Sequence, residues 1–206
     1  MTGIYIIQSG DTMLAIASQF NCTLPELVAL NSHISDPNLI YAGQQLNVPD
    51  RGVNGSSPAA VHSGDDPQWY KIAFEELNTT EFSGDDHNPR IIEYHSTTTL
   101  KARADEVPWC SSFVNWCVEQ AGLAGTKSAA ARSWLQWGTG LAQPQKGCIV
   151  VLSSSRGPTS GHVGFFVRQE GNHVLLLGGN QNNSVNFSSY SRSRLLGYRW
   201  LAQTQH

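Results

Sequence analysis

The feature that most constrains this chain is a stretch just after its first quarter that has too few apolar residues to form a hydrophobic core. Residues 50–67 read Asp-Arg-Gly-Val-Asn-Gly-Ser-Ser-Pro-Ala-Ala-Val-His-Ser-Gly-Asp-Asp-Pro, a run of turn formers without apolar periodicity. This composition predicts a flexible linker between one domain of residues 1–49 and another of residues 68–206. Each domain must then bury an apolar core of its own.

The first domain has the pattern of two short strands around two helices. Residues 4–7 form an apolar run of strand length, and an amphipathic segment follows over residues 13–20. Thr23 and Glu26 have the spacing of a capping box, which predicts a second helix that ends near Asn31. Residues 43–49 read as a closing strand, so the expected order is strand, helix, helix, strand.

Short motifs are spread along this first domain. They are Tyr5, Gly10-Asp11-Thr12, Ile16-Ala17, Leu27, Asn31, Ile40-Tyr41-Ala42-Gly43-Gln44, Leu46 and Val48-Pro49. Together they resemble a LysM module, with Ala42 at a position where that family often has proline. The resemblance implies binding of glycans that contain N-acetylglucosamine, chiefly peptidoglycan and chitin. It places the sugar groove at Gly10, Asp11, Thr12, Met13, Pro37, Asn38, Leu39 and Ile40, and the alternative is that these residues only shape turns.

The second domain is organised around a cysteine at the start of a helix. Pro108 precedes Cys110 by two residues, and apolar residues at helical spacing continue as far as the stop signal at Gly122. Backbone N–H groups and the helix dipole at such a position favour a thiolate, which a nucleophile needs. The alternative is a buried and inert thiol, which is common for free cysteine.

The remaining segments predict an α+β fold. Helices are expected over residues 68–77, from residue 90 to residue 95, and over residues 128–137. Apolar runs of strand length follow at residues 148–152, 162–167, 174–177, 185–187 and 195–201, which predicts roughly five strands of an antiparallel sheet.

A hairpin in this sheet brings a histidine opposite a side-chain amide. A three-residue tip at Glu170-Gly171-Asn172 places His162 opposite Asn180, and a two-residue turn at Gly171-Asn172 places it opposite Gln181. Opposite Cβ atoms are ~5 Å apart, so either amide reaches the imidazole and can fix its tautomer. That is the role of the third member of a Cys-His-Asn triad.

Four motifs of the second domain carry a further resemblance. They are Pro-Trp-Cys-Ser-x-Phe-Val-Asn-Trp-Cys at residues 108–117, Ala-Arg-Ser-Trp-Leu at 131–135, Gly-His-Val-Gly-Phe at 161–165 and Leu-Gly-Gly-Asn-Gln at 177–181. These motifs resemble the papain-like NlpC/P60 and CHAP cysteine peptidoglycan hydrolases. The resemblance implies Cys110 as nucleophile, His162 as general base and then acid, and Asn180 as the orienting residue, with Gln181 as the alternative.

Composition argues against several other classes of protein. A net charge of -3 does not suit a nucleic-acid binder, and no apolar run approaches the ~20 residues of a membrane span. Neither the four cysteines nor the histidines have zinc spacing, and the acidic loop of residues 83–89 lacks the ligand pattern of an EF-hand. We therefore expect no metal and no organic cofactor.

Both domains thus predict action on the bacterial cell wall. The expected activity is hydrolysis of a peptidoglycan amide, either as an amidase or as an endopeptidase. The first residues lack a secretory signal pattern, so we expect synthesis in the cytoplasm and delivery by another route. The favoured route is type VI secretion of an antibacterial toxin, which implies an immunity protein, and a phage endolysin is the alternative. A non-catalytic wall-binding protein and a transglutaminase-like acyltransferase remain the rival functions.

Overall fold

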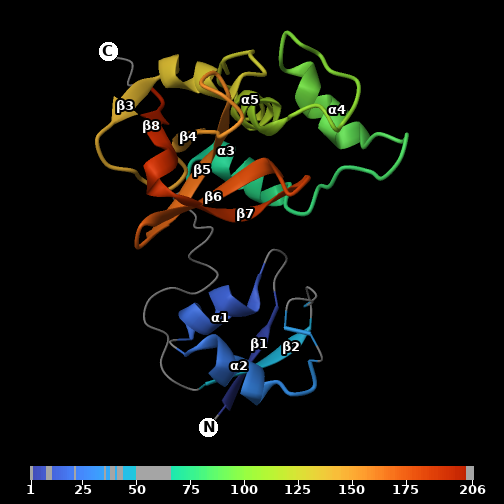
Figure 1. Cartoon of the computed structure of the whole chain (residues 1–206), viewed down its shortest axis with the longest axis vertical. Helices are drawn as coiled ribbons and strands as arrows, with labels where there is room; N and C mark the ends of the chain where they lie inside the picture. The colour runs from blue at the N-terminus through green and yellow to red at the C-terminus, as the bar shows by residue number, and fades with distance from the viewer. Residues whose placement is uncertain are drawn as a thin grey trace. The chain divides into compact units, whose positions relative to one another are not determined.

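The computed structural model describes residues 2–7, 11–20, 22–34, 36–37, 40, 44–49 and 66–202. It divides the chain into two compact units, Met1–Gly64 and Asp65–His206 (Figure 1). The last three residues of the predicted linker belong to the second unit. Pro67 is the residue before its first helix, and Asp66 forms an ion pair with Lys146 at 2.9 Å.

The first unit has the predicted order of elements. Strand β1 (Thr2–Ile6) pairs antiparallel with β2 (Gln45–Pro49), and helices α1 (Met13–Gln19) and α2 (Leu24–Leu30) lie between them in the chain. The capping box at Thr23 and Glu26 is present. Buried Asn31 ties α2 to β2, because its amide donates to the Leu27 and Asn47 carbonyls and accepts from the Asn47 N–H.

The second unit contains helices α3 (Gln68–Glu75), α4 (Pro89–Ser96) and α5 (Cys110–Gln120), and the 3-10 helices η2 (Ala131–Gln136) and η3 (Arg192–Arg194). Its sheet has six antiparallel strands in the order β3-β8-β4-β5-β6-β7. The strands are β3 (Thr139–Leu141), β4 (Ile149–Ser153), β5 (Gly161–Glu170), β6 (His173–Gln181), β7 (Ser184–Ser191) and β8 (Leu195–Trp200). The α+β prediction is confirmed.

Two local predictions for this unit differ from the structure. The predicted helix over residues 128–137 is reduced to η2, which buries Trp134. The sheet has a sixth strand, β3, at its edge. It spans only three residues with no buried side chain, so the sequence has no apolar alternation there that would predict a strand.

Helix α5 forms the centre of the second unit. It contacts α3 and α4 as well as β5 and β6, and Figure 1 shows it almost end-on. Every residue from Cys110 to Val118 is buried, as expected for a helix enclosed on all sides. The position of Cys110 is therefore fixed by the core itself. Within the described part of the chain, no helix has the length and apolar character needed to cross a membrane.

Candidate active site

Cys110 is the first residue of α5 and lines a cavity. The side chain of this cysteine is largely buried, and the polar backbone groups of Val163, Ser111 and Cys110 itself act on the sulfur by lowering its pKa. Val163 adjoins His162 on β5, so this contact brings the nucleophile helix against the histidine strand. The neighbouring Ser111 donates to the Ser128 carbonyl at 2.7 Å and thereby holds the loop that precedes η2 at the start of α5.

Burial dominates the acid–base behaviour of this thiol. Desolvation raises the pKa of Cys110, although the backbone hydrogen bonds and the positive charge of Arg156 lower it. The sequence led us to expect that the helix start would favour a thiolate. In the structure that effect is outweighed by removal of the sulfur from water, so the resting form is the neutral thiol.

His162 lies on β5, where Gln181 fixes its tautomer. Its Nε2 atom is 3.1 Å from Oε1 of Gln181. The amide nitrogen of Gln181 donates to the backbone carbonyl of Asn186 at 2.6 Å and to Oδ1 of the same residue at 3.1 Å. These bonds turn the Gln181 oxygen toward the imidazole, so Nε2 carries the proton and Nδ1 keeps a lone pair. A neutral imidazole in this state is a base.

Tyr190 is a second partner of the imidazole, and the sequence did not lead us to it. Its hydroxyl donates to Oε1 of Gln181 at 3.0 Å and lies 3.2 Å from Nε2 of His162. The two rings are 5.1 Å apart at an angle of 38°. The sequence does contain a pattern that could have predicted Tyr190 as a site residue. Asn186, Ser188 and Tyr190 are spaced two residues apart along β7 and therefore share one face of the strand.

Asn180, predicted as the orienting residue, points elsewhere. With its amide oxygen turned toward Trp109, it accepts from the Trp109 backbone N–H at 3.2 Å and from its indole N–H at 2.9 Å. The hairpin turn has two residues, but Val167 bulges, and the β5–β6 pairing ends at Phe165 opposite Leu177. Asn180 then adopts φ 55°, a left-handed conformation. This bend swings Gln181, the alternative, toward His162.

The glycines of the Leu-Gly-Gly-Asn-Gln motif allow β6 to approach α5 closely. A Cβ atom on Gly179 would lie 2.4 Å from a ring carbon of Trp109 and 2.8 Å from the Cβ of Phe113. One on Gly178 would lie 3.1 Å from Oε1 of Gln181. A strand with side chains at these positions would not leave room for the start of α5 and the orienting amide.

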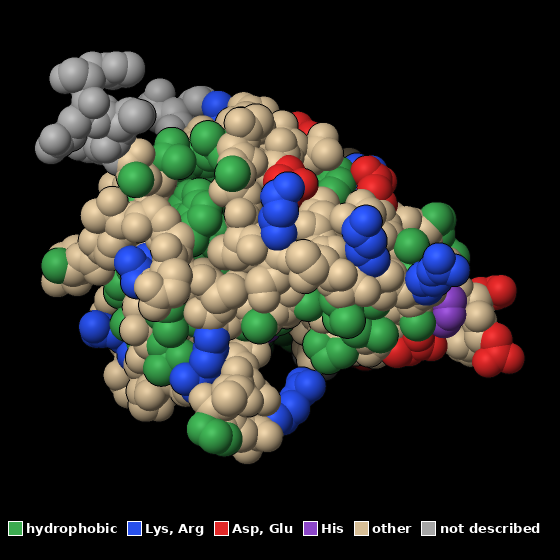
Figure 2. Space-filling view, turned by 90° about the horizontal axis from the view of Figure 1, so that it is seen from above, with side chains coloured by type: hydrophobic (Ala, Val, Ile, Leu, Met, Phe, Trp, Pro, Cys, Tyr) green, Lys and Arg blue, Asp and Glu red, His purple; other side chains and the backbone are tan. Residues whose placement is uncertain are grey.

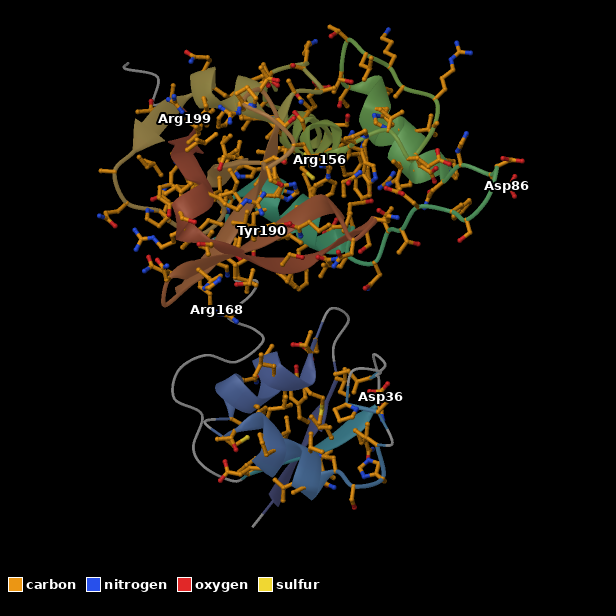
Figure 3. All side chains as sticks on the ribbon, in the orientation of Figure 1. Asp36, Asp86, Arg156, Arg168, Tyr190 and Arg199 are labelled. Atoms are coloured by element: carbon orange, nitrogen blue, oxygen red, sulfur yellow. The ribbon has the colours of Figure 1, made fainter. Side chains whose placement is uncertain are left out.

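The cavity above Cys110 has a volume of about 410 Å³ and also exposes His162, Asn180, Gln181 and Tyr190. Its remaining wall comes from Pro108, the loop of residues 129–131, the loop around residues 154–161, and Asn182 and Arg194. Figure 3 labels Arg156 and Tyr190 in this unit, on segments far apart in the sequence. Strands, helix and loops thus converge on one site.

The electrostatic setting keeps His162 neutral. Burial lowers its pKa to about 4, the hydrogen bond that Nε2–H donates to Gln181 opposes this change, and the charges of Arg194 and Arg156 add to it. At neutral pH the site therefore holds an uncharged thiol and an uncharged imidazole with a free lone pair. Proton transfer from sulfur to Nδ1 as the sulfur attacks is the chemistry that this pair can perform.

The residues of the predicted glycan groove are described only in part. Gly10, Asn38 and Leu39 lie outside the described residues. Asp11 accepts from the hydroxyl of Tyr5 at 2.7 Å, and Thr12 accepts from the N–H of Ala15 at the start of α1. Met13 is buried in the core, while Pro37 and Ile40 are half-buried. A direct role for Met13 in sugar contact does not fit its position in the core.

One group of possible metal-binding side chains exists among the described residues, formed by His87, Asp105 and Glu106. His87 Nδ1 lies 3.1 Å from Asp105 and 3.5 Å from Glu106. The second oxygen of buried Asp105 accepts from the N–H groups of Phe82 and Asn88. Through these bonds the Asp105 carboxylate holds the loop of residues 82–88 in place. That loop includes most of the acidic stretch of residues 83–89.

Comparison with known proteins divides the chain in the same way. Residues 5–49 match the LysM domain family, and residues 102–180 match the CHAP domain family. A segment of 104 residues is 40% identical to an endolysin of Bacillus phage PZA, covering 48% of this chain and 38% of the endolysin. Over 196 residues the chain is 28% identical to the probable peptidoglycan endopeptidase LytE of Bacillus subtilis, covering 94% of this chain and 54% of LytE.

The first domain has relatives of its own. A segment of 49 residues is 45% identical to the secreted LysM effector ECP6 of Passalora fulva, covering 24% of this chain and 22% of that protein. The chain therefore spans about half or less of the length of each of these relatives.

Proposed function

Because this chain joins a LysM domain to a CHAP domain, we propose that it is a cysteine hydrolase that cleaves an amide bond of the peptidoglycan peptide. The observation that carries the proposal is the arrangement around one cavity of Cys110, His162 and Gln181. The similarity of the chain to an endolysin and to a probable peptidoglycan endopeptidase supports the choice of substrate.

The reaction follows from the neutral resting pair. His162 Nδ1 takes the thiol proton of Cys110 as the sulfur attacks the amide carbonyl carbon. The backbone N–H at the start of α5 stabilises the oxyanion. His162 then protonates the leaving amine as the C–N bond breaks, which leaves a thioester. A water that gives its proton to His162 hydrolyses this thioester, so the second product is a carboxylic acid and the thiol is restored.

The first domain contributes through the local concentration of substrate. In the proposal it binds glycan strands by the groove that includes Asp11, Thr12 and Pro37, and the linker keeps the hydrolase domain near the stem peptides. Tethering of this kind raises the effective concentration of substrate without any new contact at the active site.

Digestion of purified sacculi tests the proposal. Wild type is expected to release fragments whose new termini, read by mass spectrometry, distinguish an amidase from an endopeptidase. Cys110→Ala is expected to release none, and Cys22→Ala, which removes a thiol from the other unit, is expected to act as wild type. If neither wild type nor Cys110→Ala releases fragments and both sediment with sacculi, the proposal is wrong and the protein is a wall-binding module. Incorporation of an added amine in place of water would indicate an acyltransferase.

The route to the wall is a further part of the proposal. We favour a toxin injected into rival bacteria by type VI secretion, with action in the periplasm and neutralisation by an immunity protein that blocks the Cys110 cavity. A phage endolysin is the second candidate, favoured by the similarity to the phage PZA protein. Loss of export upon deletion of the secretion sheath in the source strain would support the first, and export that continues unchanged would reject it.

A further inference from the structure

The cavity above Cys110 contains two arginines and no acidic residue among its lining side chains. Arg156 comes from the loop after β4, and Arg194 comes from η3. These segments are far from α5 in the sequence, yet both arginines line the same cavity as Cys110 and His162. Figure 2 shows Lys and Arg side chains on both sides of a hollow in one face.

Arg194 is held in place by contacts that leave its charge uncompensated. Its Nε donates to the Ser153 carbonyl at 2.9 Å, and its guanidinium carbon lies 5.0 Å from the centre of the Tyr190 ring. The Ser153 hydroxyl donates in turn to the Arg194 carbonyl at 3.1 Å. These bonds engage Nε but not the two terminal NH₂ groups, which form the fork that matches a carboxylate.

Arg156 lies on a loop that is fixed near both ends. Its own N–H donates to the Ser154 hydroxyl at 3.2 Å, and Arg132 donates from Nε to the Ser160 carbonyl at 2.9 Å. The Arg156 side chain is exposed. Across the described part of the chain, neither Arg156 nor Arg194 forms an ion pair, whereas Arg90 pairs with two glutamates.

Two unpaired guanidinium groups in a cavity that has no acid of its own are suited to an anionic ligand. We propose that Arg156 and Arg194 form a subsite for a free carboxylate of the stem peptide, beside the amide that Cys110 attacks. The enzyme then prefers stem peptides with a free carboxylate next to the scissile bond over those in which this group is amidated. This inference rests on the proposed function, because it specifies the substrate of the same site.

The positive charges of the two arginines act on the proposed catalytic residues. Both lower the pKa of His162, and Arg156 also lowers the pKa of Cys110. A substrate carboxylate bound between the guanidinium groups would cancel part of this field. The imidazole would then become a stronger base when the correct substrate is in place. Recognition of the carboxylate and activation of the base are in this way linked.

Paired synthetic stem peptides test the subsite. They differ only in whether the glutamate α-carboxyl or the free carboxyl of the diamino acid is amidated. Binding is measured to Cys110→Ala, which does not consume the peptide, and cleavage is measured with wild type. We expect amidation of one of these groups to weaken binding and raise KM by about tenfold or more, as the loss of a charged hydrogen bond predicts. Arg194→Gln and Arg156→Gln should each reduce this preference.

Arg192→Gln is the matched control, because Arg192 lies in the same turn and carries the same charge but does not line the cavity. It should keep the preference for the free carboxylate. Equal affinity of Cys110→Ala for free and amidated peptides would overturn the subsite, and so would an equal effect of Arg192→Gln. Arg194→Lys, which keeps the charge, and thermal unfolding of each variant exclude a loss caused by misfolding.

Failure of the two proposals is distinguishable. If wild type cleaves free and amidated peptides equally well, the subsite is wrong and the hydrolase remains. If wild type cleaves nothing while Cys110→Ala still binds only the free carboxylate in an arginine-dependent way, the subsite stands and the hydrolytic function falls.

Discussion

Replacing Gln181 by leucine tests whether this residue, rather than Asn180, orients His162, the proposed general base. Gln181 is 2% exposed, and its amide makes hydrogen bonds to His162, Tyr190 and Asn186. Leucine keeps most of the volume but removes every one of these bonds. It leaves the imidazole Nε2–H with only the Tyr190 hydroxyl, 3.2 Å away, so the ring loses the amide oxygen that fixes its direction.

The size of the effect follows from the cost of an unpaired buried group, about 1–3 kcal/mol. If that cost appears as lost orientation in the transition state, kcat falls by about 5- to 150-fold, since about 1.4 kcal/mol corresponds to tenfold. The assay is the steady-state rate on a soluble stem peptide, with thermal unfolding measured in parallel.

Asn180→Gly is the matched comparison for Gln181→Leu. Glycine adopts φ 55° without strain, so this change removes the amide that faces Trp109 while it leaves the backbone free to keep its bend. We expect kcat to stay within about threefold of wild type, because an exchange with no contact to the imidazole removes no transition-state interaction. A large loss for Asn180→Gly together with near wild-type activity for Gln181→Leu would refute the reasoning.

Gln181→Glu gives an independent readout through pH. A carboxylate beside the imidazole favours its charged form and raises the pKa of His162 above about 4. His162 must be neutral to accept a proton, so activity is lost as the pH falls through this pKa. The acid limb of kcat/KM should therefore move to higher pH in Gln181→Glu. An unmoved limb would mean that residue 181 does not face the general base.

Three further predictions concern other parts of the site. Tyr190→Phe removes one hydroxyl from the imidazole network and should lower kcat by about 3- to 10-fold without unfolding, as a net hydrogen bond of about 1 kcal/mol implies. Gly179→Ala places a Cβ 2.4 Å from Trp109 and should destabilise the second unit by about 1–3 kcal/mol in thermal unfolding, whereas Gly140→Ala, with no contact closer than 3.5 Å, should not. Because burial raises the pKa of Cys110, its alkylation by iodoacetamide should keep accelerating as the pH rises above neutral. A rate that is already constant at neutral pH would contradict the neutral resting thiol.

Local sequence signals accounted for much of this fold. The capping box at Thr23, the start of α5 after Pro108 and the strand runs of the sheet all depend on neighbours in the chain. Elements of this kind can be predicted because the residues that stabilise them lie within a few positions of one another in the sequence. The motifs, through resemblance to a known family, also singled out Cys110 and His162, which line one cavity in the structure.

The remaining features of the site depend on distant parts of the chain. The bulge at Val167 shifts the β5–β6 register toward the one that would place Asn180 opposite His162, and the left-handed bend at Asn180 then selects Gln181. Neither feature is marked by the turn sequence. The neutral state of Cys110 depends on how completely the core encloses it, which a helix start does not reveal. Arg194 lines the cavity because η3 lies beside the end of β4, where its Nε donates to the Ser153 carbonyl.

The burial of α5 on all sides also determines where this protein tolerates sequence change. The nucleophile is carried by the innermost helix, so a substitution along α5 alters the core before it alters the chemistry. The two arginines are carried instead by the loop of residues 154–160 and by η3, which has no buried residue. Surface segments of this kind tolerate replacement and insertion. A mutant library aimed at new cell-wall peptides should therefore randomise these two segments and leave the helix untouched.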